Sequence, residues 1–281
     1  MKISFTKMHG CGNDYIYING ADYTIENKKE LSIRLSDRHF GIGGDGIIFI
    51  NPSEQADFEM EMYNADGSRA EMCGNGIRSV AKYVYDKGLT EKKELKIESA
   101  GSIKTIWLTT NEDKVTAVRV NMGRPILRPE QIPVLTDEKK EVILEELIEV
   151  EGKQFHYTAV SMGNPHAVIQ VEDPMSVEIE KLGPMIEHHQ NFPKRINTEF
   201  IKVEDRQNIT MRVWERGSGE TLACGTGACA VAAACILNGL TENKVTVKLL
   251  GGSLLIEWDR DQDQIYMTGP AETVFEGTIE V

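Results

Sequence analysis

One motif occurs twice in this chain of 281 residues. The stretches AEMCGNGIRSVAKYVYDKGLTEK and LACGTGACAVAAACILNGLTENK each contain a cysteine, a Gly-x-Gly turn, a helix-like run and Gly-Leu-Thr-Glu. Their cysteines, Cys73 and Cys224, are 151 residues apart. The same offset joins Asn13 to Asn164, Met60 to Met211, and Trp107 to Trp258. A constant offset over such a length indicates a tandem duplication of one folding unit.

Each half of the sequence predicts a strand-rich unit with one central helix. YIYIN and FEMEMYN in the first half, and HAVIQV and ITMRVWE in the second, have the apolar patterns of strands. After Cys73 the apolar residues recur at the spacing of one helix face. After Cys224 the run ACAVAAACIL is apolar on all sides and predicts a deeply buried helix. Gly88 and Gly239 lie where helix C-termini are expected. The strands and the central helix of each unit together predict an α+β fold class.

The duplication also predicts the domain organisation. We expect an N-terminal lobe over residues 1–122 and a C-terminal lobe over residues 123–269. The stretch 125–152, rich in charge and proline, is interpreted as the passage between the lobes. By symmetry, residues 270–281 are expected to return to the first lobe and complete it.

Composition limits the classes of partner. The net charge of −13 and the lack of a basic run exclude a nucleic-acid or anionic-membrane surface. The first residues lack the apolar core of a signal peptide, and no apolar run is long enough to span a bilayer. Five cysteines without tight pairing are typical of reduced cytosolic thiols. We therefore expect a cytoplasmic protein that acts on a small molecule.

The position of the repeated cysteines favours acid/base chemistry. A thiol before a helix meets unpaired N–H groups, which favour its thiolate form. The turns at Gly74-Asn75 and Gly225-Thr226 offer backbone N–H groups that can hold a carboxylate. Two such thiols fit a racemisation or epimerisation, in which one group removes a proton and the other delivers one. Structural packing and a redox or ligand-binding role are the alternatives. Cys11, Cys229 and Cys235 lack symmetry partners and are expected to be packing residues, and no ligand spacing for zinc is present.

The motifs MHGCGNDY, YNADGSRAEMCGNGIR, GNPHAV, RINTEF and WERGSGETLACGTGACA together resemble the diaminopimelate epimerase family. The resemblance implies two pseudo-symmetric lobes, each a mostly antiparallel, β-barrel-like sheet around a central helix, with the active site between them. It implies interconversion of LL- and meso-2,6-diaminopimelate in lysine and peptidoglycan precursor biosynthesis. It further implies that no pyridoxal phosphate or metal is used, and that the enzyme is a homodimer.

Carried to this sequence, the resemblance makes Cys73 and Cys224 the two acid/base thiols. His166 and Glu215 are implied to support catalysis. The residues implied to bind substrate are Asn13, Asn64, Gly74, Asn75, Asn164, Asn197, Glu215, Arg216, Gly225 and Thr226. One position departs from the family pattern, because Gly46 stands where many members have a substrate-contacting glutamine. A proline or hydroxyproline racemase is the competing enzyme, although Glu215 and Arg216 favour a substrate with a second amino-acid end.

Overall fold

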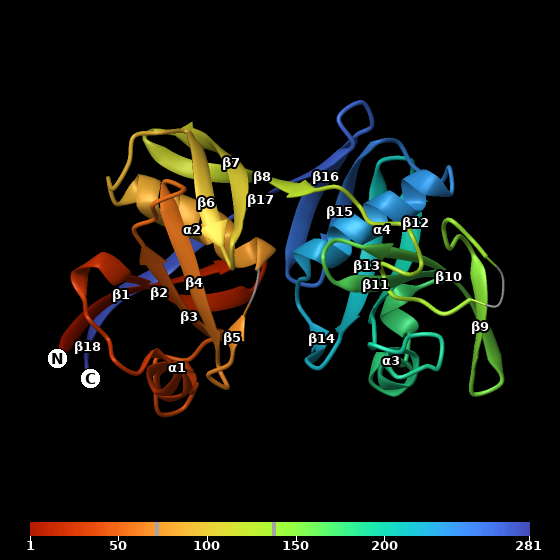
Figure 1. The fold of residues 1–281 in the computed structure, drawn as a ribbon, viewed down its shortest axis with the longest axis horizontal. Helices are drawn as coiled ribbons and strands as arrows, with labels where there is room; N and C mark the ends of the chain where they lie inside the picture. Colours follow the sequence, from red (N-terminus) through yellow and green to blue (C-terminus); the bar gives the residue numbers. More distant parts are fainter. Residues whose placement is uncertain (71–72, 137–138) are drawn as a thin grey trace. The chain divides into compact units, whose positions relative to one another are not determined.

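The structure is a computed structural model that describes residues 1–70, 73–136 and 139–281. The chain divides into two compact units. The N-terminal unit comprises Met1–Asn121 and Thr268–Val281, and the C-terminal unit comprises Met122–Met267. Each is an α+β unit, so the predicted fold class is confirmed (Figure 1).

The N-terminal unit is a sheet that curves around one helix. Its elements are β1 (Lys2–Gly10), β2 (Asn13–Asn19), η1 (Gly20–Asp22), α1 (Lys28–Ser36), β3 (Gly46–Asn51), β4 (Phe58–Asn64), β5 (Arg69–Ala70), α2 (Gly74–Asp86), β6 (Glu94–Ser99), β7 (Ser102–Asn111), β8 (Lys114–Gly123) and β18 (Glu272–Glu280). Helix α2 packs against β1, β2, β6 and β7. The pairs β2–β3 and β4–β6 are parallel, and the neighbouring pairs β1–β2, β3–β4, β6–β7 and β7–β8 are antiparallel.

The C-terminal strand belongs to the N-terminal unit. β18 pairs antiparallel with β1 over the length of both strands, from Lys2 opposite Glu280 to His9 opposite Glu272 (blue beside red in Figure 1). The ring of Phe5 on β1 also meets the ring of Phe275 on β18 edge to face. The last segment of the chain therefore supplies one edge of the sheet that begins the chain.

The C-terminal unit repeats the same order of elements. They are β9 (Glu146–Val150), β10 (Lys153–Ser161), β11 (Pro165–Gln170), η2 (Pro174–Ser176), α3 (Ile179–Glu187), β12 (Asn197–Asp205), β13 (Asn208–Glu215), β14 (Gly219–Thr221), α4 (Gly225–Leu237), β15 (Lys244–Leu249), β16 (Gly252–Asp259) and β17 (Gln264–Gly269). The pairs β11–β12 and β13–β15 are parallel, as are β2–β3 and β4–β6. Helix α4 packs against β10, β11, β12, β15 and β16, and its residues from Ala228 to Cys235 are all buried.

The offset between the repeats changes after the central helix. Helices α2 and α4 begin and end 151 residues apart, at Gly74 and Gly225 and at Asp86 and Leu237. The next strands, β6 and β15, begin at Glu94 and Lys244, which is an offset of 150. The prediction that Trp107 corresponds to Trp258 is therefore wrong. The loop before β15 is one residue shorter, so Trp258 stands where the first unit has Leu108.

Much of the stretch 125–152 is built into the C-terminal unit and does not form a passage. Ile126 forms a β-bridge with Ser161, and β9 pairs with β10. Ile132, Val134, Ile143 and Ile148 are buried in the core cluster that also contains Phe200. The charged residues of this stretch hid its apolar positions, which are spaced irregularly and match neither a helix nor a strand period.

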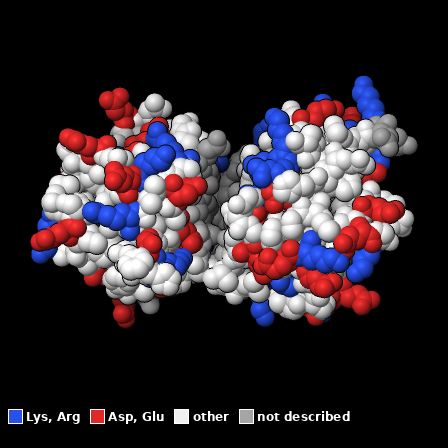
Figure 2. All heavy atoms as spheres, turned by 90° about the horizontal axis from the view of Figure 1, so that it is seen from below, with Lys and Arg blue, Asp and Glu red and all other residues white. Residues whose placement is uncertain are grey.

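The described helices include none that is both long and apolar enough to cross a membrane. On the face drawn in Figure 2, basic and acidic side chains are interspersed.

Candidate active site

Each repeated cysteine is the N-cap of its central helix. Cys73 precedes α2, and its Sγ accepts a hydrogen bond from the backbone N–H of Gly76 at 3.2 Å. Cys224 precedes α4, and its Sγ accepts from the N–H of Gly227 at 3.4 Å. Both glycines are closely packed, because an added Cβ would lie 2.8 Å from Ile48 Cδ1 at Gly76 and 2.7 Å from Glu199 Oε1 at Gly227. N–H groups that point at sulfur stabilise negative charge on it.

In the N-terminal unit, Asn13 is held against Cys73 by a carboxylate. The Cys73 thiol lies 3.3 Å from Asn13 Oδ1, and Asn13 Nδ2 donates to Asp45 Oδ2 at 2.7 Å. Asp45 Oδ1 in turn accepts from Arg38 at 3.0 Å. Because Asp45 binds the amide nitrogen, the amide oxygen must face the sulfur. Asp45 was not predicted as a site residue, although it lies in the glycine-rich stretch GIGGDG.

Asp14 fixes the same loop to Arg38 and Lys7. Arg38 donates to both carboxylate oxygens, at 2.7 and 3.1 Å, and Lys7 Nζ lies 2.6 Å from Oδ2. Burial alone would raise the pKa of Asp14, but the hydrogen bonds and charges of Arg38 and Lys7 outweigh it and lower that pKa. These ion pairs hold the start of β2, where Asn13 lies.

A buried arginine within α2 holds the first turn of that helix in place. Arg78 has no exposed surface, and its guanidinium donates to Gly74 O at 3.1 Å and to Asn75 Oδ1 at 2.9 Å. Its Nε donates to Pro270 O at 3.1 Å, in the returning C-terminal segment. Arg78 therefore orients Gly74 and Asn75, the residues predicted to bind a carboxylate. Its counterpart in the second unit is Cys229, so the duplication gave no signal for it.

At the other end of this half-site, Asn64 and Gly46 lie opposite each other on β4 and β3. Asn64 Nδ2 donates to Ser68 Oγ at 3.0 Å, and Asn64 O accepts from Ser32 Oγ at 2.9 Å. A Cβ on Gly46 would lie 2.0 Å from Tyr63 O and 3.0 Å from the Tyr15 ring. The backbone here thus has no room for a side chain where the family pattern has a glutamine.

In the C-terminal unit, Cys224 has polar and acidic neighbours. Its Sγ lies 3.4 Å from Thr226 Oγ1. Burial, followed by the charges of Glu215 and Glu199, raises the pKa of Cys224 well above its usual range, and the Thr226 and Gly227 hydrogen bonds oppose this. Burial also raises the pKa of Glu215, which bonds to Thr221 and Cys224. This half-site therefore favours protonated groups.

His166 is fully buried between two site residues. Its Nδ1 lies 2.6 Å from Glu199 Oε1, and its Nε2 lies 3.1 Å from Asn164 Oδ1. Both His166 and Glu199 have side chains with no exposed surface. The structure thus brings His166 and Asn164, two of the residues predicted for the site, into direct contact. Glu199, the fifth residue of RINTEF, was not singled out from the sequence.

Asn197 joins the β11 edge to the loop that carries Arg216. Its Nδ2 donates to Pro165 O at 2.7 Å, and its Oδ1 accepts from the backbone N–H of Arg216 at 2.9 Å. The Arg216 side chain is exposed, and its guanidinium donates to Lys194 O at 3.0 Å. Asn197 was predicted to contact substrate, and here its amide positions the Arg216 backbone.

A buried carboxylate holds the other side of that loop. Glu187, the last residue of α3, is 3% exposed. Its Oε2 accepts from Trp214 Nε1 at 2.7 Å, and its Oε1 accepts from Gly217 N at 3.1 Å and from Arg195 at 3.2 Å. Glu187 therefore fixes the residues on both sides of Glu215 and Arg216. Nothing in the sequence near Glu187 indicated this role.

The remaining cysteines are buried free thiols: Cys11, Cys229 and Cys235. Burial raises the pKa of Cys235 to about 12. It also raises the pKa of Cys11, an effect that Arg78 opposes. These environments keep Cys11 and Cys235 protonated, and the burial of all three is what packing residues show. Within the described part of the chain, no three His, Cys, Asp or Glu side chains are arranged to hold a metal ion.

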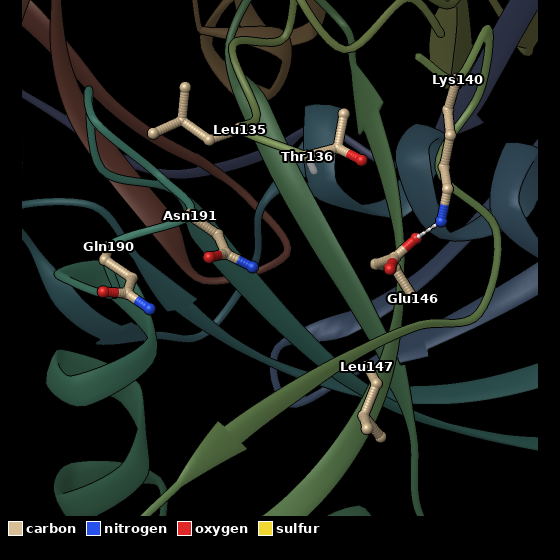
Figure 3. Close-up of a pocket in the computed structure, with 7 residues that line it drawn as sticks. All are labelled: Leu135, Thr136, Lys140, Glu146, Leu147, Gln190 and Asn191. Atoms are coloured by element: carbon tan, nitrogen blue, oxygen red, sulfur yellow. Dashed lines mark hydrogen bonds and ion pairs between the residues drawn. The ribbon is translucent and has the colours of Figure 1, made fainter. Parts of the chain in front are cut away.

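The C-terminal unit has a surface pocket whose lining includes no residue of either cysteine half-site. Figure 3 shows Lys140 pointing at Glu146, with which it forms an ion pair. The lining residues are Leu135, Thr136, Lys140, Glu146, Leu147, Gln190 and Asn191. None of them is a predicted site residue or a thiol.

Comparison with known proteins identifies the family. The sequence profile of the family described as diaminopimelate epimerase matches residues 5–127 and 158–274. The chain belongs to the diaminopimelate epimerase family. A diaminopimelate epimerase of Acetivibrio thermocellus is 57% identical over 99% of this chain and 98% of its own length. One of Methanococcus maripaludis is 53% identical over 99% of this chain and 100% of its own length. Members of this family are isomerases, and this chain is one.

Solved structures of more distant proteins share the fold. A phenazine biosynthesis protein of the PhzF family from Bacillus anthracis has a TM-score of 0.73, with 17% identity and full coverage of both chains. A hydroxyproline epimerase from Agrobacterium vitis has a TM-score of 0.68 and 13% identity, over 99% of this chain and 91% of its own. At these identities the likeness establishes the fold and leaves the substrate open.

Proposed function

We propose that this chain interconverts LL- and meso-2,6-diaminopimelate, using Cys73 and Cys224 as the acid and the base. The observation that carries the proposal is the repeated arrangement of a thiol at a helix N-cap beside an asparagine or a carboxylate. This arrangement agrees with the activity named for the relatives that are 57% and 53% identical, which are diaminopimelate epimerases.

In the proposed reaction, one thiolate takes the proton from the α-carbon. The electrons of the broken C–H bond pass into the substrate carboxylate, and the thiol on the opposite face gives its proton to the carbon. N–H groups of the Gly74-Asn75 and Gly225-Thr226 turns hold that carboxylate and stabilise its added charge. Glu215, which bonds to Cys224, exchanges the proton with this thiol between turnovers.

The remaining predicted residues bind the second amino-acid end of the substrate in this proposal. The Arg216 guanidinium pairs with its carboxylate, and Glu215 attracts its ammonium. The asparagines that supply fixed amide groups are Asn13, Asn64, Asn164 and Asn197. Gly46 contributes no side chain, so the neighbouring Asn64 makes the polar contact at that edge.

The test is a proton NMR assay of the purified enzyme with LL-diaminopimelate in D2O, without added cofactor. We expect loss of the α-proton signal and formation of the meso isomer. Cys73→Ala and Cys224→Ala should each abolish formation of the meso isomer, while the folds of the units persist. L-Proline and trans-4-hydroxy-L-proline serve as competing substrates. Exchange with either of these, and none with diaminopimelate, would favour the racemase alternative, and no exchange at all would favour a redox or binding protein.

We also propose that the enzyme is a cytoplasmic homodimer that uses no pyridoxal phosphate or metal and supplies lysine and peptidoglycan precursors. The cysteines of the described residues form no disulfide with one another, which suits a reducing compartment. Sedimentation velocity measures the dimer, and dialysis against a chelator followed by the same NMR assay tests the absence of a metal requirement. A monomeric sedimentation coefficient would refute the dimer.

A further inference from the structure

The buried pair of His166 and Glu199 is a feature that the proposed acid/base steps do not use. Both side chains have no exposed surface, and only one carboxylate oxygen of Glu199 is bonded. The other, Oε2, is buried without a hydrogen-bond partner in the described part of the chain. A buried carboxylate with one oxygen unsatisfied destabilises a fold, so its presence calls for a functional explanation.

The duplication supplies an internal comparison for this pair. At the 151-residue offset, His166 corresponds to Tyr15 and Glu199 to Ile48. The backbone places them equivalently, because Ile16 pairs with Ile47 in the first unit as Ala167 pairs with Thr198 in the second. The fold therefore accepts an apolar residue at this position, as Ile48 shows in the first unit. Glu199 is not needed there for the fold alone.

Glu199 lies beside the glycine that donates to the Cys224 sulfur. A Cβ on Gly227 would be 2.7 Å from Glu199 Oε1 and 3.2 Å from Cys224 Sγ. A Cβ on Gly76 would be 2.8 Å from Ile48 Cδ1 and 3.4 Å from Cys73 Sγ. The sulfur of the second unit thus has a carboxylate where the first has a methyl group.

The two units also anchor their asparagines differently. In the first unit Asp45 binds Asn13 directly. In the second, Glu199 binds Nδ1 of His166, and Nε2 of the same ring meets the amide of Asn164. A carboxylate accepts a hydrogen bond from Nδ1–H, so Glu199 holds the ring with its Nε2 toward Asn164. The carboxylate is therefore placed to act on Asn164 through the ring and on Cys224 through its charge.

We propose that Glu199 is a positioning residue that makes the Cys224 half-site chemically unlike the Cys73 half-site, by orienting His166 against Asn164 and by favouring the protonated thiol of Cys224. That Cys224 is the proton donor in the free enzyme depends on the proposed function. That the two thiols differ in ionisation does not depend on it. The charged or titratable groups that act on Cys224 are Glu215 on β13 and Glu199 on β12, and Glu199 is itself paired with His166 on β11.

The test measures alkylation of each cysteine by iodoacetamide, with peptide mass mapping, as a function of pH. The midpoint of each rate curve reports ionisation and does not depend on access to the sulfur. In the unaltered enzyme we expect the Cys224 midpoint above that of Cys73. Glu199→Gln keeps an acceptor for His166 and removes the charge, so Cys224 should react about tenfold faster below its midpoint, the effect of one pKa unit on the thiolate fraction.

The matched control is Glu204→Gln, which removes an exposed carboxylate from the same strand. It should leave the Cys224 rate unchanged, as Glu199→Gln should leave the rate of Cys73. Faster alkylation of the buried Cys229 and Cys235 would reveal unfolding and overturn the interpretation. A Cys224-to-Cys73 rate ratio unchanged by Glu199→Gln would also overturn the proposal.

If Glu199→Gln does not fold, the unaltered enzyme still tests the proposal. A Cys224 midpoint at or below that of Cys73 would contradict it. These alkylation results do not depend on the substrate. An enzyme that fails to epimerise diaminopimelate would refute the proposed function and leave this inference standing.

Discussion

Replacing Glu187 by alanine should weaken both the C-terminal unit and the recognition of substrate. The change removes the acceptor of the Trp214 indole N–H, which lies against α3, and of the Gly217 N–H in an exposed turn. A buried donor left unpaired costs about 1–3 kcal/mol, and water can replace the acceptor of Gly217. The Arg195 side chain is 51% exposed, so its ion pair adds little.

From these contacts we expect a loss of about 3 kcal/mol in the free energy of unfolding, with the lost Glu187 packing included. For a unit of this size, that lowers Tm by about 6–12 °C. The loop with Glu215 and Arg216 is then free to move, so KM for diaminopimelate should rise more than kcat falls. Glu187→Gln keeps the volume and one acceptor, and should give an intermediate change.

The assays are differential scanning calorimetry and the kinetics of epimerisation. Glu180→Ala, an exposed change on the same helix, is the control and should shift the free energy of unfolding by no more than about 0.5 kcal/mol. If Glu187→Ala leaves Tm and KM at their original values, Glu187 does not hold this loop and the interpretation is wrong.

Three further changes test individual groups. Burial raises the folded-state pKa of Glu215 above its unfolded value. The stability contributed by Glu215 is therefore present at low pH and is lost as pH rises through the folded pKa. Glu215→Gln should raise Tm at pH 7, measured by calorimetry, while activity falls. Gly227→Ala should reduce kcat more than Gly76→Ala, because its methyl meets a carboxylate oxygen at 2.7 Å and the other meets the movable end of Ile48 at 2.8 Å; equal losses would contradict this. Arg216→Lys should raise KM about tenfold or more, since an ammonium cannot form two parallel bonds to a carboxylate, and an unchanged KM would remove Arg216 from the binding residues.

The sequence was a good guide to the parts of the fold that the duplication repeats. The two helices begin directly after Cys73 and Cys224, and FEMEMYN is β4 from its first residue to its last. Helices α1 and α3 were not predicted. Helix α1 has only a weakly apolar face, and in α3 the interior Pro184 argued against a helix although Ile179, Leu182 and Ile186 lie on one helical face.

The site was predictable where a residue acts through its own atoms and a motif repeats it. Cys73, Asn13 and their counterparts stand out for that reason. Asp45, Glu187 and Glu199 act through another side chain or a backbone N–H, and their partners lie about 30 residues away in the sequence. Such contacts depend on strand register, which no local pattern reveals.

The pairing of β18 with β1 sets an order for folding during synthesis. The C-terminal unit is continuous in sequence, so all of it is synthesised before β18. The N-terminal unit is made first, but it must wait for residues 272–280 to cover the edge of β1 and for Pro270 O to accept the hydrogen bond of Arg78 on α2. The half that carries Cys73 is therefore the last to mature. A nascent chain stalled near its end would expose the bare edge of β1 to other chains, which makes this strand the point where aggregation should begin.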